Sequence, residues 1–160
     1  ALCRSRIGHG VGMHDVELVL RTLPSLPLRD AAQDAAGRAF AAWCAKQRAF
    51  ARVLNPATPG SPGHEHWLAH CTACAGLVTV EVDPRFAPAQ VDAFVDALKV
   101  FRIGWSWGGP VSLAVPYDPK AIRQRPTPYR GTLVRFCLGL EAVEDLIADA
   151  EQALASGLGG

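Results

Sequence analysis

Apolar residues repeat at helical spacing in two segments near the start of the chain. The first segment has them at i, i+3, i+4 and i+7, which predicts an amphipathic helix: Val16, Val19, Leu20 and Leu23. Asp15 is a candidate N-cap for this helix, and Pro24 predicts a stop or a kink at its end. A longer helix is predicted after the sequence PSLP and ends near residue 46, with an inward side formed by Ala36, Ala39, Phe40, Trp43 and Cys44.

The pattern changes after the sequence NPATPGSPG at residues 55–63, which is typical of a loop and precedes a short helix through HEHWLAHC. Short β-branched or alternating segments then predict four strands, at residues 76–82, 100–105, 111–115 and 132–138. Helical spacing returns at residues 88–98 and in a final helix that ends near Gly157. We expect the acidic residues of that last helix to form a solvated face rather than a ligand set.

This order of elements predicts an α/β (α+β-like) domain, in which several strands are joined by turns. A length of 160 residues with 49% hydrophobic and 19% charged residues is typical of one globular domain. The net charge of +1 disfavours nucleic acid as a partner. No segment has the length of a membrane span or of a signal-peptide core, so we expect a cytoplasmic protein with no membrane partner. The five cysteines, an odd number, suit a reducing compartment.

Arg135 is the first candidate for chemistry. Alternation in TLVRFCL places Leu133, Arg135 and Cys137 on one face of the strand, so the guanidinium lies mid-strand among apolar residues. A charge in that position requires an anion, and the planar fork of arginine suits a carboxylate or a phosphate. The sequence leaves two partners open: a ligand, or an internal aspartate or glutamate.

A second candidate is the sequence SWGG. Ser106 and Trp107 precede two glycines at a strand end, where backbone N–H groups can approach a ligand closely. The alternative is a tight turn or a bulge in which Trp107 fills the core.

The sequence HEHWLAHCTAC at residues 64–74 places His66, His70, Cys71 and Cys74 close together. These are zinc ligands in principle, but no further pair completes a typical set of four. A redox role for the two cysteines is equally weakly supported, because they do not begin a helix in a βαβ unit. We therefore predict no metal site.

The sequences ALKVFRIGWSWGGPVSLAVPYD and GTLVRFCLGLEAVEDLIADAEQAL resemble the C-terminal part of the Cys/Met-metabolism family of pyridoxal-phosphate enzymes, in its cystathionine β-lyase branch. The resemblance extends back through DVELVLRTLPSLPLR, AAWCAKQ, ARVLNPA and SPGHEHW, and so covers nearly the whole chain. SWGG favours the β-lyase branch, because the γ-synthase and γ-lyase branches usually carry SLGG there. Two positions depart from the family pattern: Trp105 stands where tyrosine is common, and Cys137 where histidine is common.

The resemblance implies the small C-terminal domain of a fold-type-I enzyme, with a mostly antiparallel sheet, helices packed on it and a long helix before it. Residues 1–48 would be a helical connector from a large cofactor domain outside this sequence, and residues 49–160 the small domain. It also implies pyridoxal 5'-phosphate as the cofactor of the complete enzyme, and assembly as a homotetramer.

For function, the resemblance implies β-elimination of L-cystathionine, or of a related cysteine S-conjugate, to homocysteine, pyruvate and ammonia in methionine biosynthesis by transsulfuration. By the same resemblance, Arg135 binds the substrate α-carboxylate, helped by Ser106 and Trp107. None of Lys46, Lys99 and Lys120 lies in the family's cofactor-lysine context, so we predict no catalytic or cofactor-binding residue here and no activity of the chain alone. The rival hypothesis is a non-catalytic domain that binds an amino acid or a partner subunit.

Overall fold

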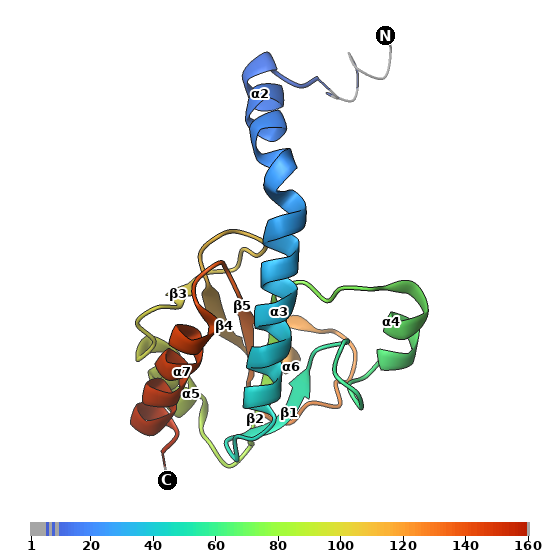
Figure 1. The fold of residues 1–160 in the computed structure, drawn as a ribbon. Coiled ribbons are helices and arrows are strands. Elements are labelled where there is room, and N and C mark those ends of the chain that lie inside the picture. Colours follow the sequence, from blue (N-terminus) through green and yellow to red (C-terminus); the bar gives the residue numbers. More distant parts are fainter. Residues whose placement is uncertain (1–5, 7, 9, 160) are drawn as a thin grey trace.

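A five-stranded sheet in the order β1-β2-β5-β4-β3 forms the centre of the protein in the computed structural model, which describes residues 6, 8 and 10–159 (Figure 1). Neighbouring strands are antiparallel except for β3 and β4, which are parallel. The predicted α/β domain with a mostly antiparallel sheet is therefore confirmed. The strands are β1 (Phe50–Leu54), β2 (Leu77–Val82), β3 (Arg102–Ile103), β4 (Leu113–Tyr117) and β5 (Leu133–Cys137).

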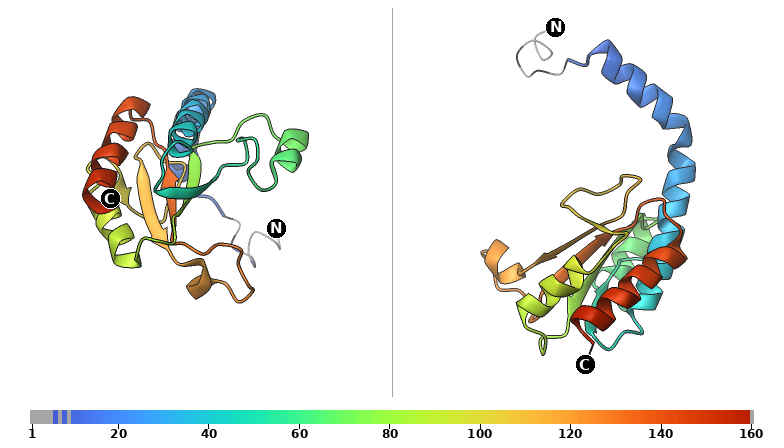
Figure 2. Two further views of the ribbon diagram at one scale, coloured as in Figure 1. Left: turned by 90° about the horizontal axis from the view of Figure 1, so that it is seen from below. Right: turned by 90° about the vertical axis from the view of Figure 1, so that its left-hand side faces the viewer.

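Helices α3, α5 and α7 pack on one face of this sheet, which we call the helix face (Figure 2). The short helices α4 and α6 lie in connections between strands. The helices are α2 (Met13–Thr22), α3 (Leu26–Cys44), α4 (His64–His70), α5 (Pro88–Asp96), α6 (Pro119–Ile122) and α7 (Val143–Gly157), with a 3-10 turn, η1 (Leu23–Ser25), between α2 and α3.

The core lies between the helix face and these three helices. Strand alternation turns Val134 and Phe136 of β5 toward the helices, and both are fully buried. The Phe136 ring meets the rings of Phe40 and Phe101 edge-on, with centroids 5.0 and 5.2 Å apart. Aromatic packing of this kind adds to the free energy gained by removing apolar area from water, and it fixes which face of β5 is inward.

The first two predicted helices are nearly continuous, and α2 with the N-terminal part of α3 forms an arm that projects away from the sheet (Figures 1 and 2). Pro24 lies in η1, where proline's fixed φ is tolerated, so the helix changes its winding there instead of stopping. The prediction that Asp15 caps the first helix was wrong, because α2 begins at Met13 with Gly12 at the N-cap. Within the described residues, no helix is both long enough and apolar enough to cross a membrane.

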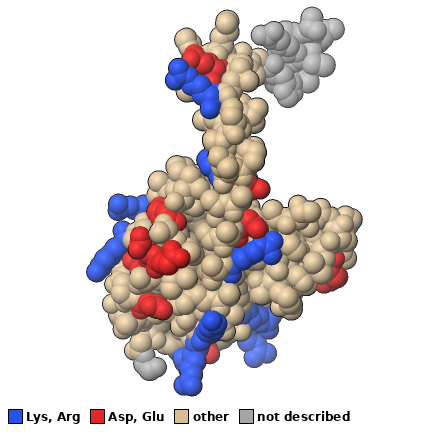
Figure 3. Space-filling view, in the orientation of Figure 1, with Lys and Arg blue, Asp and Glu red and all other residues tan. Residues whose placement is uncertain are grey.

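The arm has an apolar surface that no other part of the structure covers. No residue of α2 is buried. Figure 3 shows a stretch of the arm without charged side chains, whereas acidic side chains gather over α7. The C-terminal half of α3, by contrast, contributes Phe40, Ala41 and Cys44 to the core. The division of the chain between residues 48 and 49 stays a prediction.

Two strands differ from the sequence-based expectation. β1 was not predicted, because its alternation is interrupted by an irregularity in register between Phe50 and Arg52. β3 has only two residues rather than the expected 100–105, since Phe101 turns into the core beside α3 and leaves the sheet edge.

The acids of α7 divide into two groups. Glu144 and Asp145 of its first turn are exposed, as expected of a solvated face. Asp149 is only 5% exposed, and its carboxylate accepts hydrogen bonds from the N–H groups of Lys99, Val100 and Phe101. This one carboxylate thus fixes the turn that leads into β3, a structural role that the spacing did not reveal.

Candidate functional site

The second face of the sheet, which we call the loop face, carries Arg135. The residues of β5 that point there are Leu133, Arg135 and Cys137, opposite in direction to the core residues. Arg135 is paired in register with Thr79 of β2 and Val115 of β4, so it stands in the middle of the sheet. The predicted placement of this arginine in mid-strand, on one face with Leu133 and Cys137, is therefore confirmed.

The guanidinium of Arg135 reaches the connection between β3 and β4. Its Nη2 donates a hydrogen bond to the carbonyl oxygen of Trp105 at 2.5 Å and a longer one to that of Ser106 at 3.5 Å. Its Cζ lies 5.8 Å from the centroid of the Trp105 ring, within the range of a cation–π contact. We call residues 104–109, whose backbone Arg135 contacts, the corner.

No aspartate or glutamate in the described part of the chain forms a salt bridge with Arg135. Of the two partners that the sequence left open, the internal acid is thus not seen. Carbonyl oxygens satisfy Nη2, while Nε and Nη1 make no hydrogen bond with the described residues. The guanidinium therefore keeps donors with which to bind a carboxylate.

The tryptophans of the corner are exposed, at 62% for Trp105 and 67% for Trp107. One alternative predicted that Trp107 fills the core, and its exposure shows that this prediction was wrong. Gly108 has a φ of +74°, a conformation that side chains disfavour, and its N–H donates to Sγ of Cys137 at 3.3 Å. The SWGG sequence thus makes a turn whose one indole, that of Trp107, is exposed and whose backbone is fastened to β5.

Trp105 is a contact of Arg135 that sequence reasoning missed. The sequence identified Trp105 only as a departure from the family pattern. In the structure, the carbonyl oxygen of Trp105 accepts a hydrogen bond from Arg135, and the Trp105 ring forms a cation–π contact with it. Of the three predicted residues, the structure brings Arg135 to the backbone of Ser106, and Trp107 follows in the same turn. The one available signal was the position of Trp105 immediately before Ser106.

Glu81 is a second charged group on the loop face, paired in register with Leu133, two rows along the sheet from Arg135. It is 3% exposed, and its Oε1 accepts hydrogen bonds from the N–H groups of Arg130 and Gly131. Its Oε2 lies 3.4 Å from Nε of Arg52. Glu81 therefore fastens the chain that enters β5 through Oε1, whereas its buried Oε2 has the ion-pair contact with Arg52 and no hydrogen bond within the described residues.

The histidines and cysteines of residues 64–74 do not gather. His66, His70 and Cys71 are exposed, and no group of three metal-ligating side chains is found within the described residues. Cys74 turns inward instead, and its N–H donates to Asp34 at 2.6 Å. Burial raises the pKa of the Cys74 thiol to about 11, so this cysteine is protonated near neutral pH.

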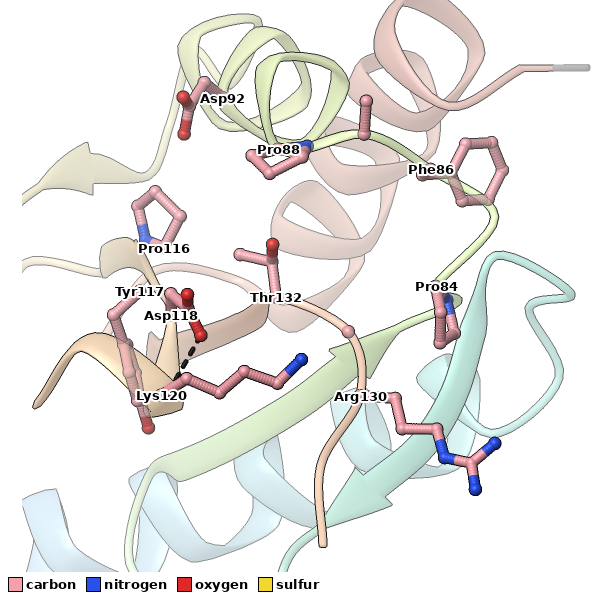
Figure 4. A pocket seen from close by; sticks show the side chains of 12 residues that line it. Pro84, Phe86, Pro88, Asp92, Pro116, Tyr117, Asp118, Lys120, Arg130 and Thr132 are labelled. Carbon is pink, nitrogen blue, oxygen red and sulfur yellow. Dashed lines mark hydrogen bonds between the residues drawn. The ribbon is translucent and has the colours of Figure 1, made fainter. Parts of the chain in front are cut away.

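The three lysines do not suit a covalent cofactor anchor, because all are exposed: Lys46, Lys99 and Lys120. A lysine that acts as a nucleophile needs desolvation or a neighbouring cation to lower its pKa. Lys120 lines a cavity of about 360 Å³ together with Tyr117 and Thr132, and Figure 4 shows its ammonium group within that cavity. Arg135 is not part of the cavity wall, so this cavity and the corner are separate features.

Comparison with known proteins gives the context for this corner. Residues 1–155 match the model of the Cys/Met metabolism PLP-dependent enzyme family. A cystathionine beta-lyase of Salmonella typhimurium is 40% identical over 114 residues, which cover 69% of this chain. An L-alanine/L-glutamate racemase of Wolbachia pipientis is 33% identical over 150 residues, or 92% of this chain.

The fold has a counterpart among solved structures. The apo structure of a methionine gamma-lyase from Micromonospora echinospora matches 96% of this chain with a TM-score of 0.79 and 28% sequence identity. The chain spans 40% of that structure, and 29% and 37% of the lyase and racemase sequences. The matched region therefore corresponds to well under half of each relative.

Proposed function

Because the chain belongs to the Cys/Met metabolism PLP-dependent enzyme family, we propose that it forms the C-terminal part of a carbon–sulfur β-lyase, in which Arg135, Ser106 and Trp107 hold the α-carboxylate of the substrate. The observation that carries this proposal is the Arg135 guanidinium, which stands on the loop face with no acid partner in the described structure and with Nε and Nη1 uncommitted. A planar fork with free donors is the group best suited to a carboxylate.

The proposed reaction is β-elimination of L-cystathionine, with water, to homocysteine, pyruvate and ammonia. In this family pyridoxal phosphate supplies the chemistry. The residues of this chain bind and orient: Arg135 pairs with the carboxylate, and the Ser106 and Trp107 turn limits its rotation. Fixing the carboxylate sets which bond at the substrate Cα is aligned for cleavage, and orientation of this kind supplies a large part of enzymatic rate enhancement.

The Salmonella relative favours a cystathionine substrate, and the sequence SWGG agrees with that branch. The Wolbachia relative favours a different reaction at the same kind of site, the racemisation of alanine or glutamate, and it matches a larger share of this chain. Pyruvate release from L-cystathionine and D-alanine formation from L-alanine, measured on one preparation, distinguish the two. We expect pyruvate release to dominate.

The complete enzyme is proposed to be a cytoplasmic homotetramer with a cofactor lysine outside these 160 residues. The 160-residue chain alone is then inactive. Treatment with pyridoxal phosphate followed by borohydride should label no single lysine, because all three are exposed. Specific labelling of one of them would contradict this part of the proposal.

The direct test is Arg135→Lys in the full-length enzyme encoded by the reading frame that contains this chain. Lysine keeps the charge but loses the two-pronged geometry, so kcat/KM for L-cystathionine should fall at least about tenfold. Arg102→Lys, at an exposed position on β3, is the matched control and should leave kcat/KM within about twofold. If Arg135→Lys also stays within twofold, the carboxylate role is wrong.

A further inference from the structure

The connection from β3 to β4 contains the corner, yet it has almost no regular structure of its own. Its geometry depends on hydrogen bonds from other elements. The carbonyl of Gly109 accepts from Nε2 of Gln33 on α3 at 2.9 Å, and that of Pro110 accepts from the N–H of Leu140 at 2.9 Å. These bonds fasten the C-terminal end of the corner to α3 and to the chain that follows β5.

The strongest attachment lies where the connection enters β4. Ser112 is fully buried, and both of its hydrogen-bond donors go to one carboxylate: the backbone N–H to Glu141 Oε1 at 2.9 Å, and the hydroxyl to Glu141 Oε2 at 2.7 Å. The Ser112 hydroxyl also accepts from the N–H of Gly139 at 2.8 Å. Residues 110–112 and 139–141 are thereby tied together by four hydrogen bonds, counting that from Leu140 to Pro110.

The close approach of these two segments explains Gly139. A Cβ at this position would overlap the carbonyl oxygen of Pro110 and the carboxylate of Glu141. Only glycine lets the backbone after β5 come so near to the connection. Position 139 lies four residues after Arg135, so the same short stretch carries both the guanidinium and the attachment for the corner that it faces.

The chemistry of this attachment favours a carboxylate at position 141. The two donors of Ser112 require two acceptors, which a carboxylate supplies and a carboxamide does not. Burial acts to raise the pKa of the Glu141 carboxyl, but the hydrogen bonds from Ser112 outweigh it and hold that pKa below its ordinary value. Glu141 is therefore ionised near neutral pH and can accept from both donors.

We propose that Glu141 is a positioning residue for the substrate carboxylate, acting through Ser112 to hold the corner in register with Arg135. This inference rests on the proposed function of the corner. By this inference Glu141 does not contact the substrate. It sets the geometry in which Arg135, Ser106 and Trp107 contact the substrate carboxylate. A displaced corner would weaken binding of the carboxylate equally in the ground state and in the transition state, while Arg135, which stays on β5, would still orient the bonds at the substrate Cα.

The test compares Glu141→Ala, Glu141→Gln and Arg135→Lys in the full-length enzyme with L-cystathionine. Loss of binding that is equal in the two states raises KM and spares kcat, so Glu141→Ala should raise KM about tenfold with kcat within about threefold. Glu141→Gln keeps one acceptor and should raise KM by a smaller factor, about threefold. Glu144→Ala, an exposed glutamate three residues along the chain, is the matched control for charge and should leave both constants unchanged.

A merely structural role predicts a different split. A destabilised enzyme loses active molecules, so the apparent kcat falls while KM stays the same, and that result would overturn the proposal. If Glu141→Ala does not fold, Glu141→Gln decides: a raised KM supports positioning, and an unchanged KM contradicts it. If Arg135→Lys lowers kcat/KM and neither Glu141 variant raises KM, positioning fails and the carboxylate site stands, whereas if kcat/KM stays within about twofold in all three variants, both fail.

A double-mutant cycle provides an independent check. Glu141→Ala and Ser112→Ala break the same attachment, so the effect of the double variant on KM should be well below the product of the two single effects. Multiplicative effects would show that the two residues act separately, and they would contradict the proposed route through Ser112.

Discussion

The two faces of β5 differ in what holds their side chains. On the helix face, Phe136 and Val134 are fully buried and contact apolar groups of three helices. On the loop face, one residue away, Arg135 stays partly exposed and bonds only to backbone oxygens of an irregular connection. One face of this strand thus stabilises the core and the other carries the proposed ligand-binding arginine, and the two are separated by strand alternation, the simplest periodicity in protein structure.

The largest expected effect is on the helix face. Phe136→Ala removes the ring at the centre of the aromatic cluster and should lower the free energy of unfolding by about 3–5 kcal/mol. Urea denaturation of the 160-residue chain measures it. Arg135→Met, the neighbour on the other face, is the matched control, and a change above about 1 kcal/mol there would break the comparison.

The second effect is a smaller loss of stability, expected at Glu81. This residue sharpens the comparison because it is charged and lies on the loop face, yet its hydrogen bonds stabilise the fold. Glu81→Ala leaves the N–H groups of Arg130 and Gly131 without their acceptor and should cost about 1–3 kcal/mol of stability in the same denaturation experiment. Glu65→Ala, at an exposed position on α4, should cost almost nothing. A neutral result for Glu81→Ala would mean that the entry to β5 does not depend on this carboxylate.

A third, still smaller effect concerns charge on the helix side. The hydrogen bond from the Arg38 side chain, acting against desolvation, lowers the pKa of Asp34 from 3.8 to about 2. Since the folded pKa is the lower one, Asp34 stabilises the fold above pH 3.8, and this contribution is lost as the pH falls toward 2. Asp34→Asn should therefore reduce the acid-induced loss of stability between these pH values, as followed by thermal unfolding. An equally steep loss in the variant would contradict this role.

The smallest expected effect is that of Cys137→Ser on the loop face. Cys137 is buried beside the N–H of Gly108, and a hydroxyl can accept the same hydrogen bond. We expect kcat/KM of the full-length enzyme to stay within about threefold, because this side chain touches the corner's backbone and not its ligand side. A loss of a hundredfold would place Cys137 in the chemistry.

Local periodicity predicted the parts of this structure that depend on neighbours in sequence. It predicted the helices other than the short α6, the strand that became β5, and the face on which Arg135 lies. It did not give the partners of Arg135, Glu141 and Glu81, which stand 29 to 50 positions away in the chain. Those contacts depend on which strands become neighbours in the sheet, and a single-sequence pattern does not encode strand order.

The same reason explains the unexpected β1 and the absence of a core role for Trp107. In β1 an irregularity in register between Phe50 and Arg52 alters the direction of the side chains, and after Trp107 the positive φ of Gly108 turns the chain. The resemblance to a family implies a carboxylate-binding role for Arg135, which stays a prediction. The geometry adds Trp105 as its contact and Glu141 as the residue proposed to hold the corner.

The most direct measurement changes both Arg135 and the substrate carboxylate that it is proposed to bind. In the full-length enzyme, kcat/KM is compared between L-cystathionine and an analogue in which the α-carboxylate beside the cleaved Cβ–S bond is an amide. In the wild type the acid should be much the better substrate, and in Arg135→Lys the ratio of the two values should shrink at least about tenfold, because the group that distinguishes them has lost its fork. An unchanged ratio would show that Arg135 does not contact the substrate carboxylate and would contradict the account.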